Sequence, residues 1–452
     1  MLKRNATNSV HKPSGVSSTA LFVPGSFLAF GLVTSLFFLW GIPNNLNDIL
    51  IRQFMKSFPI TRLEAGLVQS AFYMGYFLLA LPSAFYMRKF GYKAGFITGL
   101  VLFGSGTFLF WPASLIGRYS PFLIALFIMA AGLAFLETAS NTFIALAGPV
   151  ESSERRLNIS HAFNPLGSIT GAWIGTTFIL SGIELSPTKI ASLKAAGRYA
   201  SYVHAETVRV VSPYVVLSVV ALALAVIIGG TAFPVLTSDE LTTPSRPRSI
   251  LPLFANKHLL FSIVAQFFYV GSQVGTWSYF IQYVLQFTGQ NEKTGGYLLT
   301  GTLVMFGLGR FISAAIMKYV RPARLMGIYS LINIVLVASA VLHPGWGGVW
   351  TIFVTSFFMS LMYPTIFALG VQGLGADSKV GGSLIVMAII GGAVLTPLMG
   401  IISDVTKSIA LAYGVPLVGY AYIGCYAFFA HRRAPAAQSL LCAEEYVATI
   451  EP

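Results

Sequence analysis

Long apolar runs separated by short polar connections make up most of the chain. Each run has about 20 residues, enough for a helix to cross the hydrocarbon core of a bilayer. The runs are continuously apolar and do not alternate, which favours helices over a β-barrel. We predict twelve transmembrane helices: Phe27–Leu50, Ala65–Met87, Ala94–Pro112, Phe122–Leu146, Leu157–Leu180, Tyr214–Phe233, Leu259–Val284, Tyr297–Met317, Leu325–Leu342, Val349–Gly370, Leu384–Ile402 and Ile409–Ala430. The pattern is typical of an all-α polytopic membrane protein.

Composition and charge support this fold class. The 452 residues are 55% hydrophobic and 10% charged, whereas soluble domains are about a quarter charged. A net charge of +13 would suit a nucleic-acid partner, but the distribution of basic residues argues against one. With twelve helices and both termini in the cytosol, most of the 28 Lys and Arg residues fall in cytosolic segments. The charge therefore indicates orientation in an inner (plasma) membrane and contact with anionic lipid.

Several other site classes are excluded. The two cysteines, Cys425 and Cys442, are too few and wrongly spaced for a disulfide framework or a metal site. We expect no cofactor and no metal. The first 20 residues are polar and the first apolar run is too long for a signal peptide, so we expect no cleavable signal.

The helices fall into two halves that resemble each other. The predicted organisation is a cytosolic segment 1–26, a six-helix half 27–236, a linker 237–256, a six-helix half 257–431 and a tail 432–452. The linker is polar, Pro-rich and basic, and helices five and eleven are both rich in Gly. Two six-helix halves joined in this way imply a major facilitator fold, with the substrate site near the midplane between the halves.

Two carboxylates interrupt the apolar runs, Asp48 in the first helix and Glu137 in the fourth. A carboxylate in hydrocarbon costs several kcal/mol, so it normally faces a partner or a water-filled cavity. Removal from water favours the neutral form of a carboxyl group, which then binds and releases protons near neutral pH. The pair indicates a proton-coupled transporter.

One face of the first helix is polar and aromatic. Helical spacing places on it Trp40, Asn44, Asn47 and Asp48. Amides and a carboxylate can bind sugar hydroxyls, an aromatic ring can stack on a pyranose, and Pro43 can open the helix locally. In the alternative interpretation the amides cap the helix at the outer interface and Asp48 is juxtamembrane, because Arg52 follows shortly.

The fourth and fifth helices carry further polar positions. Glu137 and Asn141 lie one turn apart and should point the same way, whereas His161, Asn164 and Ser168 form a stripe on helix five. His161 could relay protons, although a hydrogen bond between helices is an equally good interpretation.

The second half offers aromatic and amide side chains. Tyr269, Gln273 and Trp277 recur at four-residue spacing on helix seven, and Tyr363, followed by Pro364, should interrupt helix ten. Such stripes also occur as packing or as an interface belt.

Charged residues of the remaining segments have other expected roles. Arg310 is the basic residue that we place well within a membrane span, and its partner is not identified. Asp404, near the outer end of helix eleven, is expected at the interface between membrane and water. The loop after helix two contains Arg88, Lys89 and Lys93, which could bind helix ends in one gating state or simply anchor the loop in the cytosol.

Several segments together resemble the fucose permease branch of the fucose–galactose–glucose proton symporters, within the major facilitator superfamily. The resemblance rests on Ser35–Trp40, Asn44–Leu50, Ala65–Tyr73, Tyr92–Gly99, Ala131–Ala139, Trp277–Tyr279, Tyr363–Phe367 and Ile385–Gly392, and it extends from about residue 26 to 431. It implies a sugar of the L-fucose type carried with a proton.

The resemblance also implies residue roles. Asp48 would be the proton-accepting acid, and Glu137 would act in sugar recognition and coupling. Pocket positions of the family match Asn45, Asn164, Trp277 and Tyr363. The chain departs from the family pattern at Pro43, His161 and Pro165, which lie close to the sugar site that the resemblance implies.

We therefore predict a sugar:proton symporter that works by alternating access. We do not expect an enzyme, because the sequence offers no nucleophile–base pair and no metal-binding set. The predicted substrate site comprises Trp40, Asn44, Asn45, Asp48, Glu137, Asn141, His161, Asn164, Gln273, Trp277 and Tyr363. Its partners would be a monosaccharide, a proton and the bilayer, and a monomer is expected. Alternatives are a sodium-coupled or facilitative carrier of another hexose or an amino sugar; a receptor fits less well.

Overall fold

The structure, a computed structural model, describes residues 27–146, 156, 160–233, 255–317, 319–372, 374 and 378–430. The first half contains α1 (Phe27–Ser57), α2 (Arg62–Phe108), α3 (Phe110–Ile116), α4 (Tyr119–Leu146), α6 (Phe163–Ile174), η2 (Gly175–Ile179), α7 (Pro187–Ala195), α8 (Tyr199–Val208) and α9 (Val211–Gly230). The second contains α12 (Lys257–Ser278), α13 (Phe280–Thr288), α14 (Glu292–Ile316), α15 (Pro322–Leu342), α16 (Trp346–Met359), α17 (Met362–Val371), α18 (Ser378–Met387), η4 (Ala388–Ile390), α19 (Gly391–Thr406), α20 (Ile409–Ala412), α21 (Gly414–Cys425) and η5 (Tyr426–Ala430).

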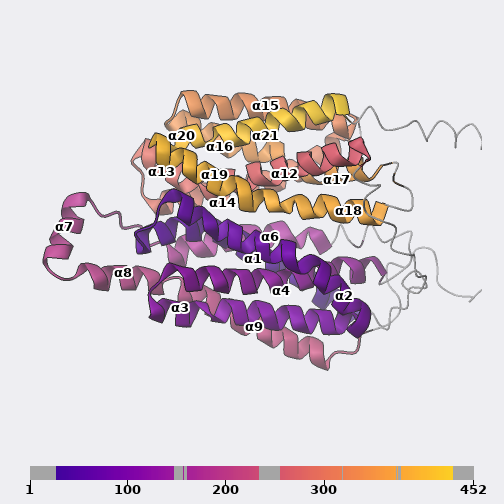
Figure 1. Ribbon diagram of the computed structural model, residues 1–452, viewed down its shortest axis with the longest axis horizontal. Coiled ribbons are helices and arrows are strands. Elements are labelled where there is room, and N and C mark those ends of the chain that lie inside the picture. Colours follow the sequence, from indigo (N-terminus) through magenta and orange to yellow (C-terminus); the bar gives the residue numbers. More distant parts are fainter. Residues whose placement is uncertain are drawn as a thin grey trace, which may run out of the picture.

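The helices form two bundles that lie side by side, as Figure 1 shows, one from α1 to α9 and one from α12 to η5. Eleven helices of the described part have the length and apolarity to cross a membrane. The predicted fifth helix, Leu157–Leu180, begins partly outside the described residues and continues as α6 and η2. The all-α polytopic fold is confirmed. Segments 1–26, most of 237–256 and 432–452 lie outside the described part, so the domain boundaries stay a prediction.

The first helix is longer than predicted, and this changes the position of its acid. α1 runs to Ser57 instead of ending at Leu50, and it continues through Pro43 without opening. Asp48 therefore lies inside the helix and is only 2% exposed. The interpretation in which the amide neighbours of Asp48 cap the helix is wrong, because the helix has two further turns beyond the acid. The position of Asp48 relative to the bilayer stays a prediction.

Two predicted helices are broken near the middle of the second bundle. Helix ten ends at Met359 and resumes at Met362, as expected from Pro364, which has no N–H to donate to the carbonyl of Ser360. Helix seven, predicted as continuous, breaks at Tyr279 between α12 and α13. There the Tyr413 hydroxyl donates to the Thr276 carbonyl at 2.9 Å, the acceptor that a continuous helix would use.

Glycines allow α1 and α6 to touch. A Cβ atom added at Gly41 would clash with the Asn164 carbonyl, and one added at Gly167 with the Phe38 carbonyl. The close contact brings the polar residues of α6 against the polar face of α1, next to the second bundle. We call the end of the molecule that contains Ser57, α7 and α8 the α7 end; it lies at the left in Figure 1.

Candidate functional site

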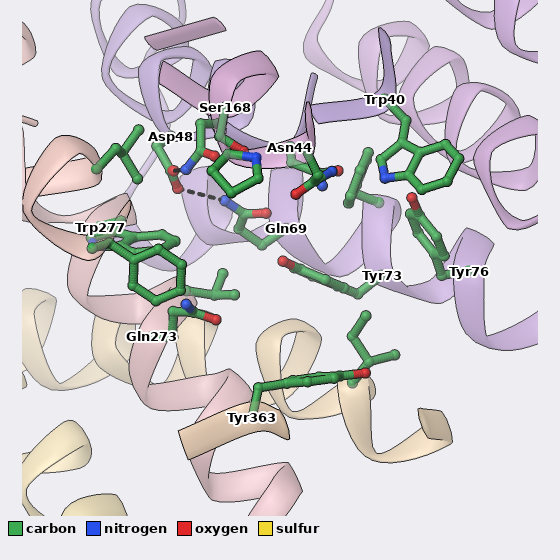
Figure 2. A pocket seen from close by; sticks show the side chains of 18 of the residues that line it. Trp40, Asn44, Asp48, Gln69, Tyr73, Tyr76, Ser168, Gln273, Trp277 and Tyr363 are labelled. Atoms are coloured by element: carbon green, nitrogen blue, oxygen red, sulfur yellow. Dashed lines mark hydrogen bonds between the residues drawn. The ribbon is translucent and has the colours of Figure 1, made fainter. Parts of the chain in front are cut away.

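A cavity of about 250 Å³ lies between the two bundles, and Figure 2 shows many of its side chains. The first bundle lines it with residues of α1, α2, α4 and the start of α6, and the second with residues of α12, α14, α17 and η4. Of the predicted substrate residues, those that line it are Trp40, Asn44, Asn45, Asp48, Glu137, His161, Asn164, Gln273, Trp277 and Tyr363. A position between the halves agrees with the midplane site expected from the sequence.

Asp48 forms part of the wall and accepts hydrogen bonds from three side chains. Asn45 Nδ2 donates to Oδ2 at 3.1 Å, while Gln69 Nε2 and the Ser278 hydroxyl donate to Oδ1 at 2.9 and 2.8 Å. Within the described part, no Lys, Arg or His side chain forms an ion pair with it. In the described part, neutral hydrogen-bond donors are therefore the groups that stabilise the charge of Asp48 when it is ionised.

Glu137 faces the cavity from α4 and is half-buried. The Tyr76 hydroxyl lies within hydrogen-bonding reach of its carboxylate. Asn141 does not line the cavity, but its Oδ1 lies 2.9 Å from Nε2 of His161, which does. Glu137 and Asn141 therefore contribute differently, the acid directly and the amide through His161.

Aromatic rings face one another across the cavity. Tyr73 of the first bundle and Tyr363 of the second point into it from opposite sides in Figure 2. Trp277 is held in place because its Nε1 donates to the Ser356 hydroxyl at 3.1 Å. Trp40 packs on Phe37 with ring centroids 4.2 Å apart. Such fixed rings provide flat apolar surfaces between the polar groups, a combination that suits an amphipathic ligand.

Four buried polar atoms of the lining residues have no hydrogen-bond partner among the described residues: Asn44 Oδ1, Gln69 Oε1, the Tyr269 hydroxyl and Arg310 Nε. Arg310 forms no ion pair within the described part; its guanidinium lies 5.1 Å from the centre of the Phe306 ring. Buried polar atoms are rarely left unpaired, so a polar ligand that donates and accepts hydrogen bonds fits this cavity.

Charged residues join the two bundles at the α7 end. Glu292, at the N-terminus of α14, accepts from Lys56 Nζ at 2.8 Å and from the Gly182 N–H at 2.9 Å. Arg52 Nε lies 3.5 Å from the same carboxylate, and Arg52 also pairs with Glu184. Because Lys56 and Arg52 belong to α1, these ion pairs join the two bundles.

A second contact between the bundles involves Asp404, which the sequence placed at the interface between membrane and water. Its carboxylate accepts from the N–H groups of Arg62 and Leu63 at 3.2 and 2.9 Å. These are the first N–H groups of α2, where a negative charge is favourable. Asp404 thus caps a helix of the opposite bundle at the α7 end.

The three basic residues predicted to act in gating lie far from these contacts. Lys93 Nζ donates to the Thr231 carbonyl at 3.0 Å, and Lys89 Nζ lies 5.1 Å from the centre of the Phe90 ring. Both contacts stay within the first bundle, and the side chain of Arg88 lies outside the described part. Lys93 does bind the end of a helix, as expected, but a gating role for these residues stays a prediction.

Four lining or contacting residues were not predicted from the sequence: Gln69, Tyr73, Tyr76 and Ser278. Gln69, Tyr73 and Ser278 lie within the segments that carry the family resemblance, so the resemblance offered a signal without assigning them a role. Tyr76 follows Phe72 and Tyr73 in an apolar run and has the pattern of an ordinary packing residue.

Comparisons with known proteins agree with this architecture. Residues 21–379 match the Major Facilitator Superfamily. The L-fucose-proton symporter of Escherichia coli (strain K12) is 40% identical over 406 residues, which cover 89% of this chain and 93% of that protein. The glucose/galactose transporter of Brucella abortus is 31% identical over 400 residues, covering 87% of this chain and 92% of that protein.

A solved structure is similar over almost the same length. The crystal structure of the major facilitator transporter FucP in the outward conformation has a TM-score of 0.67 and 39% sequence identity. The match covers 89% of this chain and 99% of FucP.

Proposed function

We propose that this chain, which belongs to the Major Facilitator Superfamily, imports a monosaccharide together with a proton. The substrate would be L-fucose or a related hexose, since relatives of similar length are named as an L-fucose-proton symporter and as a glucose/galactose transporter. Transport would follow alternating access, in which the two bundles rock around the cavity that they share.

The observation that carries the proposal is the environment of Asp48. A buried carboxyl group with three neutral donors, no cationic partner in the described part and a place in the cavity wall is suited to bind and release a proton. Glu137, Asn44 and Arg310 offer hydrogen-bonding groups to sugar hydroxyls in the same cavity, and the aromatic rings offer flat faces to the sugar ring.

We also propose an orientation and an assembly state. The distribution of Lys and Arg favours cytosolic termini in the inner (plasma) membrane, which places the α7 end outside. Since the α7 end is closed by ion pairs, this structure would then be inward-facing. Both walls of the cavity come from one chain, so a monomer contains a complete site.

Uptake by proteoliposomes tests this function most directly. Vesicles with and without an imposed inward proton gradient would be supplied with L-fucose, D-galactose and D-glucose in turn. Accumulation of one sugar only when the gradient is present supports the proposal. Equilibration without accumulation indicates a facilitative carrier, and accumulation that needs a sodium gradient indicates a sodium-coupled one.

Uptake should decrease as the external pH rises, because Asp48 has to be protonated before the loaded carrier can occlude. Proton binding removes a charge whose burial opposes closure, so the empty, ionised carrier occludes poorly while it faces outward. Adding sugar to de-energised vesicles should make the medium more alkaline, and removing sodium should change nothing. A pH electrode and radiolabelled sugar measure both effects. Sodium-dependent uptake without alkalinisation would exclude proton symport.

Replacing Glu137 should weaken both sugar affinity and coupling. A carboxylate forms hydrogen bonds roughly twice as strong as those of a neutral acceptor, so Glu137→Gln should bind sugar about tenfold more weakly. Glu137→Ala should be worse, because it leaves the Tyr76 hydroxyl and a sugar hydroxyl without a partner. Titration of purified protein by Trp fluorescence measures the affinity. Wild-type affinity in both variants would remove Glu137 from the sugar site.

A further inference from the structure

Among the three donors to Asp48, one comes from the opposite bundle. Asn45 lies on α1 itself and Gln69 lies on α2, so both belong to the same bundle as the acid. Ser278 is the last residue of α12 and donates from the second bundle at 2.8 Å. Its hydroxyl also accepts from Gln69 Nε2 at 2.9 Å, which closes a triangle of hydrogen bonds around one carboxylate oxygen.

The break in helix seven fixes the position of Ser278. The hydroxyl is fully buried at the end of α12, next to Tyr279, where the helix changes direction. Tyr279 in turn donates its hydroxyl to the Arg62 carbonyl at 2.7 Å, a contact with the first residue of α2 at the α7 end. The residues that hold this end closed and the residue that contacts Asp48 are therefore neighbours in the chain.

Rocking of the bundles would change the contacts of Asp48 selectively. Asn45 and Gln69 would move with Asp48, whereas Ser278 would move away when the α7 end opens. A hydrogen bond donated to a carboxylate favours its ionised form. Asp48 would therefore bind its proton more tightly with the α7 end open and release it more readily with that end closed.

Other charged and titratable groups near Asp48 do not donate a hydrogen bond to it, so they do not change its proton affinity in this way. Arg52, one turn further along α1, is paired with Glu184 and Glu292. The titratable groups that line the cavity together with Asp48 are Tyr73 and Tyr76 of α2, Glu137 of α4, His161, Tyr269 of α12, Arg310 of α14 and Tyr363 of α17. In the described part, none of these groups is among the hydrogen-bond donors to Asp48.

We propose that Ser278 is a positioning residue for proton release: its hydroxyl reaches Asp48 only while the α7 end is closed and thereby favours loss of the proton on the opposite side. This inference rests on the proposed sugar:proton symport and goes beyond it, because it assigns the difference between the two sides to one side chain of the second bundle.

The test compares Ser278→Ala, Ser278→Thr and the control Ser272→Ala in proteoliposomes, with L-fucose as the probe. Ser272 lies on the same helix, is equally buried, and its hydroxyl has no hydrogen-bond partner in the described part. Net uptake, which requires proton release, is measured against internal pH. Exchange of labelled for unlabelled L-fucose, which does not require proton release, is measured in parallel.

In Ser278→Ala, the internal-pH profile of net uptake should move about one unit toward alkaline pH, a tenfold change in proton binding. Net uptake at neutral internal pH should fall more than exchange does. Ser278→Thr should restore the wild-type profile, and Ser272→Ala should leave it unchanged. If Ser278→Ala does not fold, Ser278→Cys, a much weaker donor of similar size, should give the same alkaline displacement.

The possible results separate this inference from the proposed function. A wild-type protein that moves no protons with sugar overturns the symport proposal, and this inference with it. A proton-coupled wild-type protein whose profile is unchanged by Ser278→Ala overturns this inference alone. An equal displacement in Ser272→Ala would also overturn it, because the effect would then follow from loss of any buried hydroxyl on α12.

Discussion

Asp48→Asn is expected to abolish accumulation of sugar against its gradient while retaining sugar exchange. The amide has the size of the carboxyl group, and its oxygen can still accept from Gln69 and Ser278. Its NH2 group would face Asn45 Nδ2, which is also a donor. Rotating the Asn45 amide by half a turn removes this conflict, because the Asn45 oxygen then accepts from the new NH2 group. The variant thus imitates the protonated carrier, which occludes and exchanges sugar but has no proton to release.

Two measurements on the same vesicles separate coupling from binding. Uptake driven by an imposed proton gradient should disappear, whereas exchange of labelled for unlabelled sugar should persist and lose its dependence on pH. Asn47→Asp is a useful comparison, because Asn47 is an equally buried neighbour that does not line the cavity. Continued accumulation by Asp48→Asn would show that another group carries the proton.

The fold and most of the cavity could be predicted because their signals are local in the sequence. Continuous apolar runs define the helices, and helical spacing brings Trp40, Asn44 and Asp48 to one face. Every predicted substrate residue except Asn141 lines the cavity. Helical spacing predicted that Asn141 would point the same way as Glu137, but Asn141 does not line the cavity and instead contacts His161, which does.

Contacts between the bundles could not be predicted, because they depend on distant parts of the chain and on the state of the carrier. Ser278 and Asp48 are 230 residues apart, and Lys56 and Glu292 are 236 residues apart. A serine at the end of an apolar helix has no sequence feature that distinguishes it from a packing residue. Beside the break at Tyr279, the Thr276 carbonyl accepts from the Tyr413 hydroxyl, which lies 137 residues further along the chain.

The ion pairs at the α7 end lead to a prediction about the conformational equilibrium. Glu292 is fully buried and lies against both Lys56 and Arg52. Glu292→Ala would leave two partly buried cations with one carboxylate fewer, which typically costs about 3 kcal/mol. The closed α7 end should therefore become about a hundredfold less populated relative to the open one, whereas Glu292→Gln, which can still accept from the Gly182 N–H, should have a smaller effect.

Spin labels at Ile116 and Leu342 would report this equilibrium, because both residues are exposed, at 58% and 71%, and lie at the ends of α3 and α15 in separate bundles. Double electron–electron resonance on Glu292→Ala should show a larger population of long distances than the wild type. Glu64→Ala is the matched control, since Glu64 is an exposed acid near the same end whose carboxylate accepts from Thr61 within its own helix start. If both variants give the wild-type distance distribution, then the ion pairs of Glu292 do not determine whether the α7 end is closed. The helix cap formed by Asp404 then becomes the contact to test, because it joins the same two bundles through backbone N–H groups and without any basic side chain.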